Sequence, residues 1–306
     1  MKQQNTLGIL AMLLATLFFA LMNALVKKLG ADISVAQSVF FRSVLVYVFI
    51  LPLFAFKPLQ KKQKGGYLPL LIRSMAGGIS MVLFFYNIAT IPLGIASAFA
   101  QSVPIYAVFF AYFFLKERIS LGAIFATLLG FSGLLLISDP QGDIPWVNAV
   151  IGVLSGVTAA GALVSVRVCK EYFDERVIIL SFSGATLVLS LVMLWVGSYT
   201  QIEFLVYRKI DGEVYWWILA MGFFGALGQY FMTKAYILAP AGIVAPIDYV
   251  KVVFSLWFGI LLGDLVPQTR GLIGMGLVVL SGLLIALPVF IRDFKMARAG
   301  ARRGDV

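Results

Sequence analysis

The sequence predicts an all-α integral membrane protein with ten transmembrane helices in two inverted five-helix repeats. Apolar residues make up 61% of the 306 residues, charged residues only 12%, and the mean hydropathy is +0.98. A soluble globular chain is about half apolar and about a quarter charged. Ten apolar runs are long enough to cross about 30 Å of hydrocarbon, which takes roughly 20 residues. Short motifs also recur between the two halves of the chain.

The connections between the apolar runs are short, and none is large enough to form a soluble domain. The first run has a minimal charged flank and no small-residue cleavage site, so we interpret it as a span rather than a signal peptide. The ten predicted spans are residues 6–27, 36–56, 67–90, 93–115, 119–138, 146–169, 177–200, 214–238, 241–263 and 269–291.

The two halves resemble each other on either side of the polar loop 139–145. The fourth span opens with Pro-Leu-Gly at 92–94, and the ninth opens with Pro-Ala-Gly at 240–242. The sequence Ser-Gly-Leu-Leu occurs at 132–135 and again at 281–284. An odd number of spans per repeat inserts the second copy upside down, an architecture that is typical of transporters. The predicted organisation is a first repeat (1–138), an inter-repeat loop (139–145), a second repeat (146–291) and a basic cytoplasmic tail (292–306).

The net charge of +10 is distributed as the positive-inside rule requires. With the N-terminus inside, fifteen of the 24 basic residues fall on the cytoplasmic side, five on the opposite side and four within spans. We therefore predict a multi-pass protein of the cell (inner) membrane with both termini cytoplasmic. The basic tail is interpreted as a topology signal near anionic headgroups rather than as a nucleic-acid site.

Cysteine and histidine usage excludes most site chemistry. The chain has one cysteine, Cys169, and no histidine. Disulfides, Cys/His metal sites and Ser-His-Asp or Cys-His catalysis are therefore excluded. We predict no catalytic residues, no bound metal and no cofactor, and expect the partners to be a small-molecule substrate and the lipid bilayer.

The strongest candidate site is a pair of opposite charges, Asp248 and Lys251, within the ninth span. Residues at i and i+3 share one helix face. A charge at the centre of a span costs roughly 2.5 to 3.5 kcal/mol, and embedded ionisable groups usually mark functional sites. The pair is interpreted either as an internal lock between helices or as a substrate-contacting or proton-exchanging site. Tyr249, between them, adds a hydroxyl and an aromatic face.

Three further cations lie within the predicted spans. Arg42 is about two turns inside the second span and is the strongest of the three. Arg73 and Lys234 lie nearer the cytoplasmic ends, where long side chains can snorkel to the headgroups. Snorkelling is favoured slightly over ligand contact for both. If all four cations face one cavity, the excess over one carboxylate indicates a substrate with an anionic or electron-rich group.

Uncharged polar and aromatic residues complete the predicted lining of a cavity. An Asn or Gln within a span is about as often an interhelical hydrogen-bond donor as a ligand contact. Pro104 and Pro246 fall inside predicted spans, where freed carbonyls would line a cavity or merely accompany a packing kink. The remaining candidate substrate-binding residues are Asn23, Tyr86, Asn87, Gln101, Trp195 and Gln229.

Small residues at close-packing spacing occur in several spans, including Gly222, Gly225 and Gly228. Such positions let helix backbones approach closely in lipid. We interpret them as packing within one chain rather than as a dimer face, which favours a monomer slightly.

With these motifs in order on a duplicated frame, the chain resembles the ten-helix EamA-type branch of the drug/metabolite transporter superfamily over residues 6–291. The motifs that carry the resemblance are Met22-Asn-Ala-Leu-Val-Lys27, Phe40-Phe-Arg42, Pro92-Leu-Gly94, Pro104, Lys116-Glu117, Ala245-Pro-Ile-Asp-Tyr249 and Gly263-Asp264. The chain departs from the commonest form of the family at Asp264, where Glu is usual, and at Lys251.

The resemblance implies secondary transport of a small metabolite through a central cavity between the repeats. Members with a similar Phe-Phe-Arg and Pro-x-Asp-Tyr pattern are linked to uptake of S-adenosylmethionine or riboflavin, and others to export of amino acids. The expected solute is amino-acid-like, nucleoside-like or an organic anion or zwitterion. The alternatives are an accessory or lipid-flipping subunit and, less favoured, a membrane-embedded enzyme.

Overall fold

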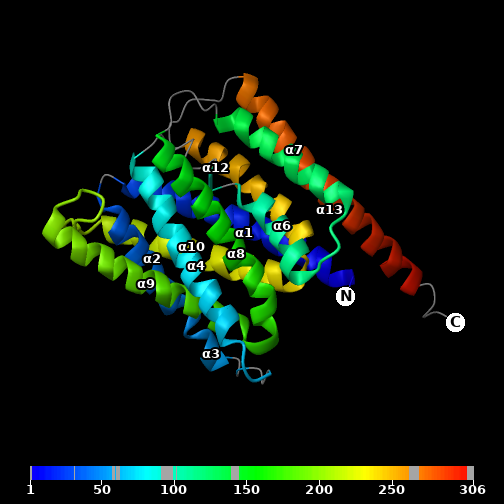
Figure 1. Ribbon diagram of the computed structural model, residues 1–306, viewed down its shortest axis with the longest axis horizontal. Coiled ribbons are helices and arrows are strands. Elements are labelled where there is room, and N and C mark those ends of the chain that lie inside the picture. Colours follow the sequence, from blue (N-terminus) through cyan, green and yellow to red (C-terminus); the bar gives the residue numbers. More distant parts are fainter. Residues whose placement is uncertain are drawn as a thin grey trace.

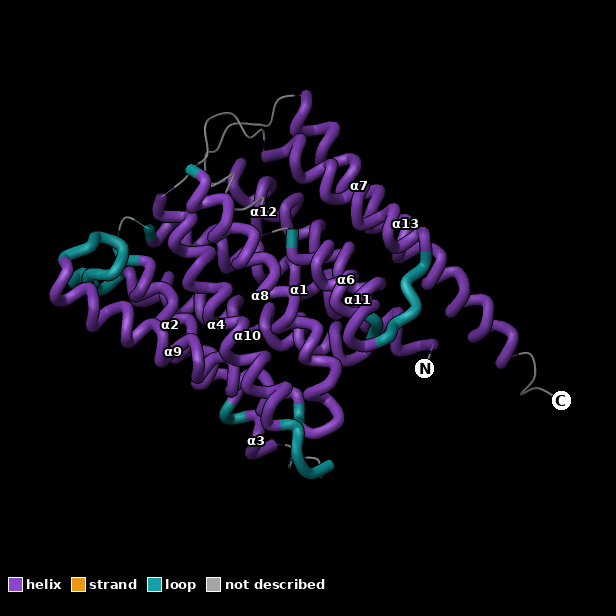
Figure 2. Tube along the Cα trace, viewed as in Figure 1, coloured by secondary structure: helices purple, strands orange, loops and turns teal. Residues whose placement is uncertain are grey.

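Each of the ten predicted spans contains helix in the computed structural model (Figures 1 and 2). The structure describes residues 2–30, 32–56, 59, 63–90, 99–100, 102–138, 145–261 and 269–301. The helices are α1 (Lys2–Leu29), α2 (Val35–Ile50), α3 (Leu53–Phe56), α4 (Tyr67–Thr90), α6 (Val103–Leu115), α7 (Leu121–Ser138), α8 (Trp146–Tyr172), α9 (Glu175–Thr200), α10 (Val214–Leu238), α11 (Ala241–Val244), the 3-10 helix η1 (Ala245–Tyr249), α12 (Val250–Leu261) and α13 (Thr269–Ala301).

Two spans end six or more residues away from the predicted limit. Helix α2 stops at Ile50, six residues before the predicted end of the second span, and a turn leads into α3. Pro52 lies in that turn, and a proline cannot donate the hydrogen bond that would continue the helix. Helix α13 runs ten residues past the predicted limit, to Ala301, and Pro288 lies within it. The predicted tail is therefore largely a continuation of the last helix.

The ninth span is not one continuous helix. It is divided into α11, η1 and α12, and Pro246 occupies the first turn of η1. The N–H of Val250 donates to the carbonyl oxygens of Ile247 and Asp248, which tightens the chain before α12 begins. Pro104 likewise lies in the first turn of α6, where a missing N–H costs no helical bond. The sequence predicted both prolines inside spans. In the structure each lies in the first turn of a helix rather than in the middle of an α-helix.

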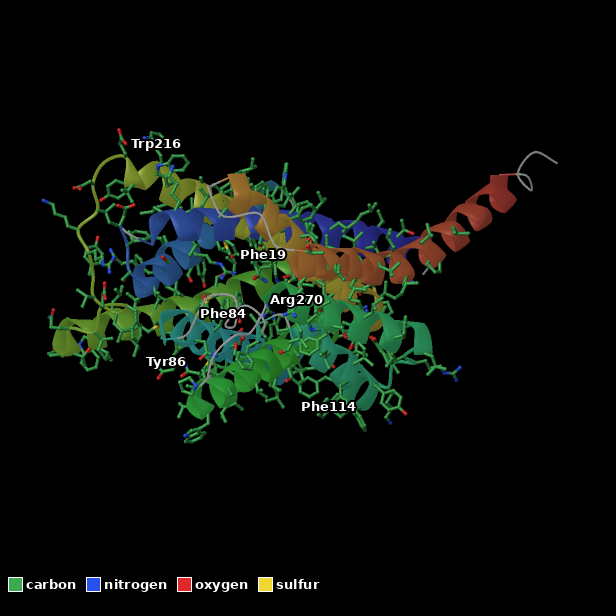
Figure 3. The ribbon with its side chains drawn as sticks, turned by 90° about the horizontal axis from the view of Figure 1, so that it is seen from above. Phe19, Phe84, Tyr86, Phe114, Trp216 and Arg270 are labelled. Atoms are coloured by element: carbon green, nitrogen blue, oxygen red, sulfur yellow. The ribbon has the colours of Figure 1, made fainter. Side chains whose placement is uncertain are left out.

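The bundle is built from pairs of helices that pack against each other. The most extensive contacts join α1 to α10, α4 to α8, α7 to α13 and α2 to α9. Further contacts join α2 to α10, α4 to α9, α6 to α8 and α1 to α12. The pair α7 and α13 lies along one side of the bundle, and the end of α13 extends beyond it (Figure 1). The start of α1 and the end of α13 lie on the same side (Figures 1 and 3).

Glycines on α10 allow its close contact with α1 and α2. Gly222 packs against Leu45, Gly225 against Met22 and Gly228 against Phe19. An ideal Cβ on Gly228 would lie 2.8 Å from the Phe19 ring, so a larger residue would push the helices apart. The predicted role of these glycines in packing within the chain is therefore confirmed for α10.

The outer surface is apolar along whole helix faces. On α9, the exposed side chains Val188, Leu191, Val192, Trp195 and Tyr199 recur at helical spacing. A soluble protein rarely leaves such a face uncovered, whereas lipid covers it readily. Four helical segments in the described part of the chain have the length and composition to cross a membrane: Gln4–Val26, Tyr67–Phe84, Trp146–Tyr172 and Glu175–Thr200. The protein is therefore an integral membrane protein.

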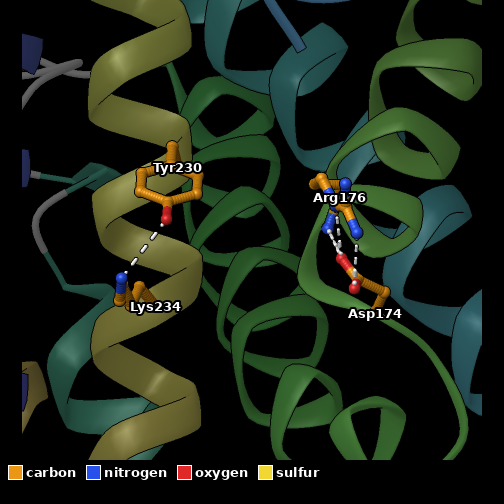
Figure 4. Close-up of polar contacts among 4 residues, drawn as sticks. All are labelled: Asp174, Arg176, Tyr230 and Lys234. Carbon is orange, nitrogen blue, oxygen red and sulfur yellow. Dashed lines mark hydrogen bonds and ion pairs between the residues drawn. The ribbon is translucent and has the colours of Figure 1, made fainter. Parts of the chain in front are cut away.

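Buried charge fixes the start of α9. Asp174 is the N-cap residue, and its carboxylate accepts from the backbone N–H of Arg176 at 3.0 Å and from the Arg176 Nε at 2.8 Å (Figure 4). The Arg176 guanidinium also lies over the Phe54 ring, 4.5 Å from its centroid. These contacts bind α3 to the beginning of α9.

Candidate functional site

Asp248 and Lys251 form a direct ion pair at the break in the ninth span. The Lys251 Nζ donates to Asp248 Oδ2 at 3.1 Å and to Oδ1 at 3.3 Å. The side chain of Asp248 is 6% exposed and that of Lys251 is 18% exposed. The i and i+3 spacing across the junction of η1 and α12 brings the two groups together, as predicted. The pair occupies the interior, where a lone charge would be costly.

The side chain of Tyr249 packs against α7 and α13. Its ring is fully buried and packs with Val278 and Phe131 between α7 and α13. An ideal Cβ on Gly130 of α7 would lie 2.6 Å from this ring, so the glycine makes room for it. Tyr249 therefore anchors the 3-10 segment to the α7 and α13 pair, and its buried hydroxyl has no hydrogen-bond partner among the described residues.

Arg42 and Arg73 carry positive charge into the bundle from α2 and α4. The Arg42 Nη1 donates to the Met81 Sδ at 3.8 Å, and the guanidinium lies 5.8 Å from the Phe19 ring centroid. Arg73 is 3% exposed, and its guanidinium lies 4.4 Å from the centroid of Phe182 on α9. The expectation that Arg73 snorkels to the headgroups is wrong, because its side chain turns inward onto an aromatic ring.

One nitrogen of the Arg73 guanidinium group is unpaired in the described structure. Its Nε is buried and has no hydrogen-bond partner among the described residues. None of the ion pairs in the described part of the chain includes Arg42 or Arg73. Buried donors are normally paired, so an unpaired guanidinium nitrogen in a membrane interior is unusual.

Tyr236 of α10 connects this region to the ion pair. It is fully buried and lies within electrostatic range of Asp248, Arg73 and Glu117. Asp248 of the ninth span and the inward-facing Arg73 therefore both lie near Tyr236. No sequence pattern singled out Tyr236, because a tyrosine in a span is usually a packing residue.

Two candidates on α10 make contacts within their own helix. Gln229 is buried, and its Nε2 donates to the Thr233 Oγ1 at 3.3 Å. Lys234 is half-buried, and its Nζ donates to the Tyr230 hydroxyl at 3.2 Å (Figure 4). The hydroxyl takes up part of the hydrogen-bonding capacity of the ammonium group. Lys234 does not reach Asp248 through any contact in the described structure.

Other candidate residues do not come together at the ion pair. Asn87 is buried and exchanges hydrogen bonds of 3.1 Å with the side chain and carbonyl of Asn148, so it joins α4 to α8. Trp195 is 64% exposed on the lipid-facing stripe of α9 and makes an edge-to-face contact with Tyr199. Neither side chain contacts the Asp248 and Lys251 pair in the described structure, and their predicted place in a solute site stays a prediction.

The last three candidates are less informative. Asn23 is exposed near the end of α1, and Tyr86 is half-buried on α4. Figure 3 shows Tyr86 and Phe84 on the same side of the bundle. Gln101 lies outside the described residues.

A second charged cluster, which the sequence did not predict, joins the ends of three segments. Glu117 follows α6, and its Oε1 lies 2.6 Å from the Nε of Arg167 in α8. Glu117 Oε2 accepts from the backbone N–H of Ala241, at the start of α11, at 3.2 Å. Lys170 donates to the Ile237 carbonyl of α10 at 3.2 Å. Burial raises the pKa of the Glu117 carboxyl, and Arg167 opposes this shift.

The described residues contain no group of three or more His, Cys, Asp or Glu that could hold a metal ion. Cys169 is buried and free.

Comparison with known proteins places the chain among transporters. Residues 6–139 match the model of the EamA-like transporter family. An uncharacterised transporter of Helicobacter pylori is 38% identical over 96% of this chain and 99% of its own length. The pseudopaline exporter of Pseudomonas aeruginosa is 32% identical over 91% of this chain and 95% of its own length.

A solved crystal structure has the same fold, with a TM-score of 0.77 and 16% identity, and the match covers 96% of this chain and 100% of that one. The relatives are transporters rather than enzymes. Full-length similarity of this extent, together with the match over residues 6–139, identifies the chain as a member of the EamA-like transporter family.

Proposed function

We propose that the protein is a secondary transporter that moves a small metabolite across the cell (inner) membrane by alternating access. The solute is an amino-acid-like, nucleoside-like or organic anionic or zwitterionic molecule, bound in a central cavity between two inverted five-helix repeats. The observation that carries this proposal is the buried Asp248 and Lys251 pair at the break in the ninth span. Embedded ionisable groups beside interrupted helices are a common feature of transporter binding sites.

The pattern of helix contacts supports the inverted-repeat part of the proposal. If α1, α2, α4, α6 and α7 form one repeat, their counterparts are α8, α9, α10, the α11 to α12 segment and α13. Exchanging the halves converts the α1 and α10 contact into that of α8 and α4, and both contacts are extensive. The α2 and α10 contact exchanges with that of α9 and α4. The contact between α7 and α13 is unchanged by this exchange, because the two helices are counterparts of each other.

The comparisons support a metabolite as the solute. One full-length relative is an exporter of pseudopaline, which makes a small organic molecule the expected type of cargo. The interior of the present chain adds Arg42 and Arg73 to one ion pair, and this cationic excess favours a solute with a negative group.

Flux through the purified protein tests the function. We expect liposomes containing the protein to take up at least one radiolabelled solute from a panel of amino acids, nucleosides and organic acids, chemically unchanged. Asp248→Asn serves as the inactive variant and Trp195→Leu, on the lipid-facing stripe, as the matched active control. Movement of a fluorescent lipid without solute flux would instead support the lipid-flipping alternative, and absence of both would support an accessory subunit.

A further inference from the structure

Two inward-facing arginines approach the same face of α4. Arg73 bends along its own helix, since an ideal Cβ on Gly77, one turn later, would lie 2.8 Å from the Arg73 Nη1. Arg42 reaches the same helix from α2 and contacts the Met81 Sδ at 3.8 Å. Gly77 and Met81 are four residues apart, so they share one face and are separated by about 6 Å along the axis. Arg42 also lies within electrostatic range of Arg73.

The contacts of both guanidinium groups leave their hydrogen-bonding edges available. Phe182 lies over Arg73 at 4.4 Å, and Phe19 is the aromatic neighbour of Arg42 at 5.8 Å. A ring over the flat face of a guanidinium does not occupy the in-plane N–H groups, which match the geometry of a carboxylate. Among the described residues, the only polar contact of Arg42 is with a thioether, a weak acceptor, and the Nε of Arg73 has no partner.

The local packing makes room for this arrangement. Gly77 has no side chain where the Arg73 Nη1 and the Phe182 ring both approach, each 2.8 Å from an ideal Cβ position. Gly225 on α10 lies next to Arg42, whose Cγ and Nε are at ordinary contact distances of 3.6 and 3.7 Å from an ideal Cβ there. Each arginine therefore lies next to a glycine, Gly77 on α4 and Gly225 on α10.

The nearby carboxylate does not neutralise these arginines. Asp248 is bound through both oxygens to the Lys251 Nζ, so the pair is already neutral as a unit. Two like charges in a poorly hydrated interior repel each other and favour an anion between them. A ligand with two negative groups would satisfy both edges at once.

We propose that Arg42 and Arg73 bind the two carboxylate groups of a small organic dicarboxylate against the face of α4 between Gly77 and Met81. This inference rests on the transport function proposed above and specifies the class of its solute. A chain of four or five carbons with a carboxylate at each end bridges the two contact points. The Asp248 and Lys251 pair is then a separate element, which does not hold the anionic groups of this solute.

Ligand-dependent unfolding of the full-length protein in detergent tests this site. Glutarate is the probe, glutaramide its neutral counterpart of equal length, and butyrate the single-carboxylate control. A ligand that binds only the folded state raises the unfolding temperature. We expect glutarate to raise the temperature, glutaramide to have no effect, and butyrate to require a higher concentration than glutarate.

Variants locate the binding to the two arginines. Arg42→Gln and Arg73→Gln each remove a charged hydrogen-bonding partner, and we expect each to weaken glutarate binding about 10- to 100-fold. Arg73→Lys keeps the charge but loses the planar fork, so its affinity falls between those of the wild type and Arg73→Gln. Arg270→Gln, at an exposed position on α13, is the matched control and retains wild-type binding. Because Arg42 and Arg73 lie on different helices, failure of one variant to fold leaves the other informative.

Three results would overturn the assignment. These are no stabilisation of the wild type by glutarate, equal glutarate affinity in the wild type and both Gln variants, or equal stabilisation by inorganic phosphate. The general transport function fails separately, through the absence of any solute flux in liposomes. Flux of a neutral solute at wild-type rate in Arg42→Gln and Arg73→Gln would preserve the transporter and eliminate the dicarboxylate site.

Discussion

Glu117 and Arg167 are joined by a 2.6 Å ion pair that links the end of α6 to α8, and the second oxygen of Glu117 accepts from the first N–H of α11. One carboxylate thus holds three segments on the side of the bundle predicted to be cytoplasmic. In a protein that works by alternating access, a contact of this kind must break when that side opens.

The first prediction uses Cys169, the lone cysteine, which lies two residues after Arg167 and is buried. Glu117→Gln removes the ion pair, so we expect the cytoplasmic side to open more often and maleimide to label Cys169 about fivefold faster, as about 1 kcal/mol would produce. Glu203→Gln removes the exposed ion pair with Arg208 and is the matched control. An unchanged labelling rate in Glu117→Gln would show that this contact does not hold the structure closed.

The same pair predicts a pH dependence. Burial raises the pKa of Glu117 above that of an ordinary glutamate, against the opposing effect of Arg167. As the pH falls through this raised pKa, the carboxylate is neutralised and the wild type comes to resemble Glu117→Gln. The ratio of labelling rates between the variant and the wild type should therefore fall towards one at acid pH. Taking the ratio cancels the titration of the thiol itself.

The second prediction concerns the buried acid of the ninth span. Asp248→Asn keeps the size of the side chain but removes the charge that binds Lys251, and we expect transport to be lost while the protein remains folded and inserted. Solute flux in liposomes and elution from a sizing column measure the two properties. Full flux in Asp248→Asn would assign the residue to packing alone.

The third prediction separates locking from function at Lys251. Lys251→Met leaves Asp248 buried without its partner, and an uncompensated charge of this kind costs about 3 to 5 kcal/mol. The double variant Asp248→Asn, Lys251→Met should regain stability, because no charge remains, and yet stay inactive. Denaturant titration and flux measure the two outcomes. A double variant that transports at the parental rate would show that the pair is structural.

The fourth prediction addresses the join between α4 and α8. Asn87→Leu removes two hydrogen bonds to Asn148, and we expect a stability loss of roughly 1 to 2 kcal/mol, since such bonds average about 0.6 kcal/mol in membranes. Transport per folded molecule should remain near the wild-type rate. Asn23→Leu, at an exposed position, is the control for stability. A variant that is stable but loses flux would return Asn87 to the candidate solute site.

The fifth prediction is topological. In a Cys169→Ser background, single cysteines at positions 60–64 and 300–305 should react only from the cytoplasm, and cysteines at 141 and 205 only from outside. This follows from the distribution of basic residues. Cytoplasmic labelling at 141 would contradict the inverted-repeat organisation.

Much of the fold follows from hydropathy, because bilayer thickness fixes the length of a span. The limits predicted for the third and eighth spans match α4 and α10 at both ends. Prediction was weaker where a proline changed the backbone, as at Pro52 and Pro246, because proline position alone does not distinguish a kink from a helix start. The helical continuation beyond Ile291 was missed, since polar residues end a span without ending a helix.

The candidate site was only partly predictable. The Asp248 and Lys251 contact follows from helical spacing, whereas Arg73 depends on Gly77 and Phe182, which come from different helices. The Glu117 and Arg167 pair joins residues fifty positions apart, and no local pattern indicates that contact. Trp195 and Asn87 were assigned to a lining from residue type, and only packing shows that one faces lipid and the other a neighbouring helix.

Helix α13 is longer than a membrane span requires, so its end can act as a lever. Its 33 residues make a rod about 50 Å long, of which only about 30 Å is needed to cross the hydrocarbon. The remaining part amplifies rotation: a tilt of about 10° displaces its tip by about 3 to 4 Å relative to the membrane surface. A spin label or fluorophore near residue 299 would therefore report rocking of the α7 and α13 pair from a position remote from any bound solute.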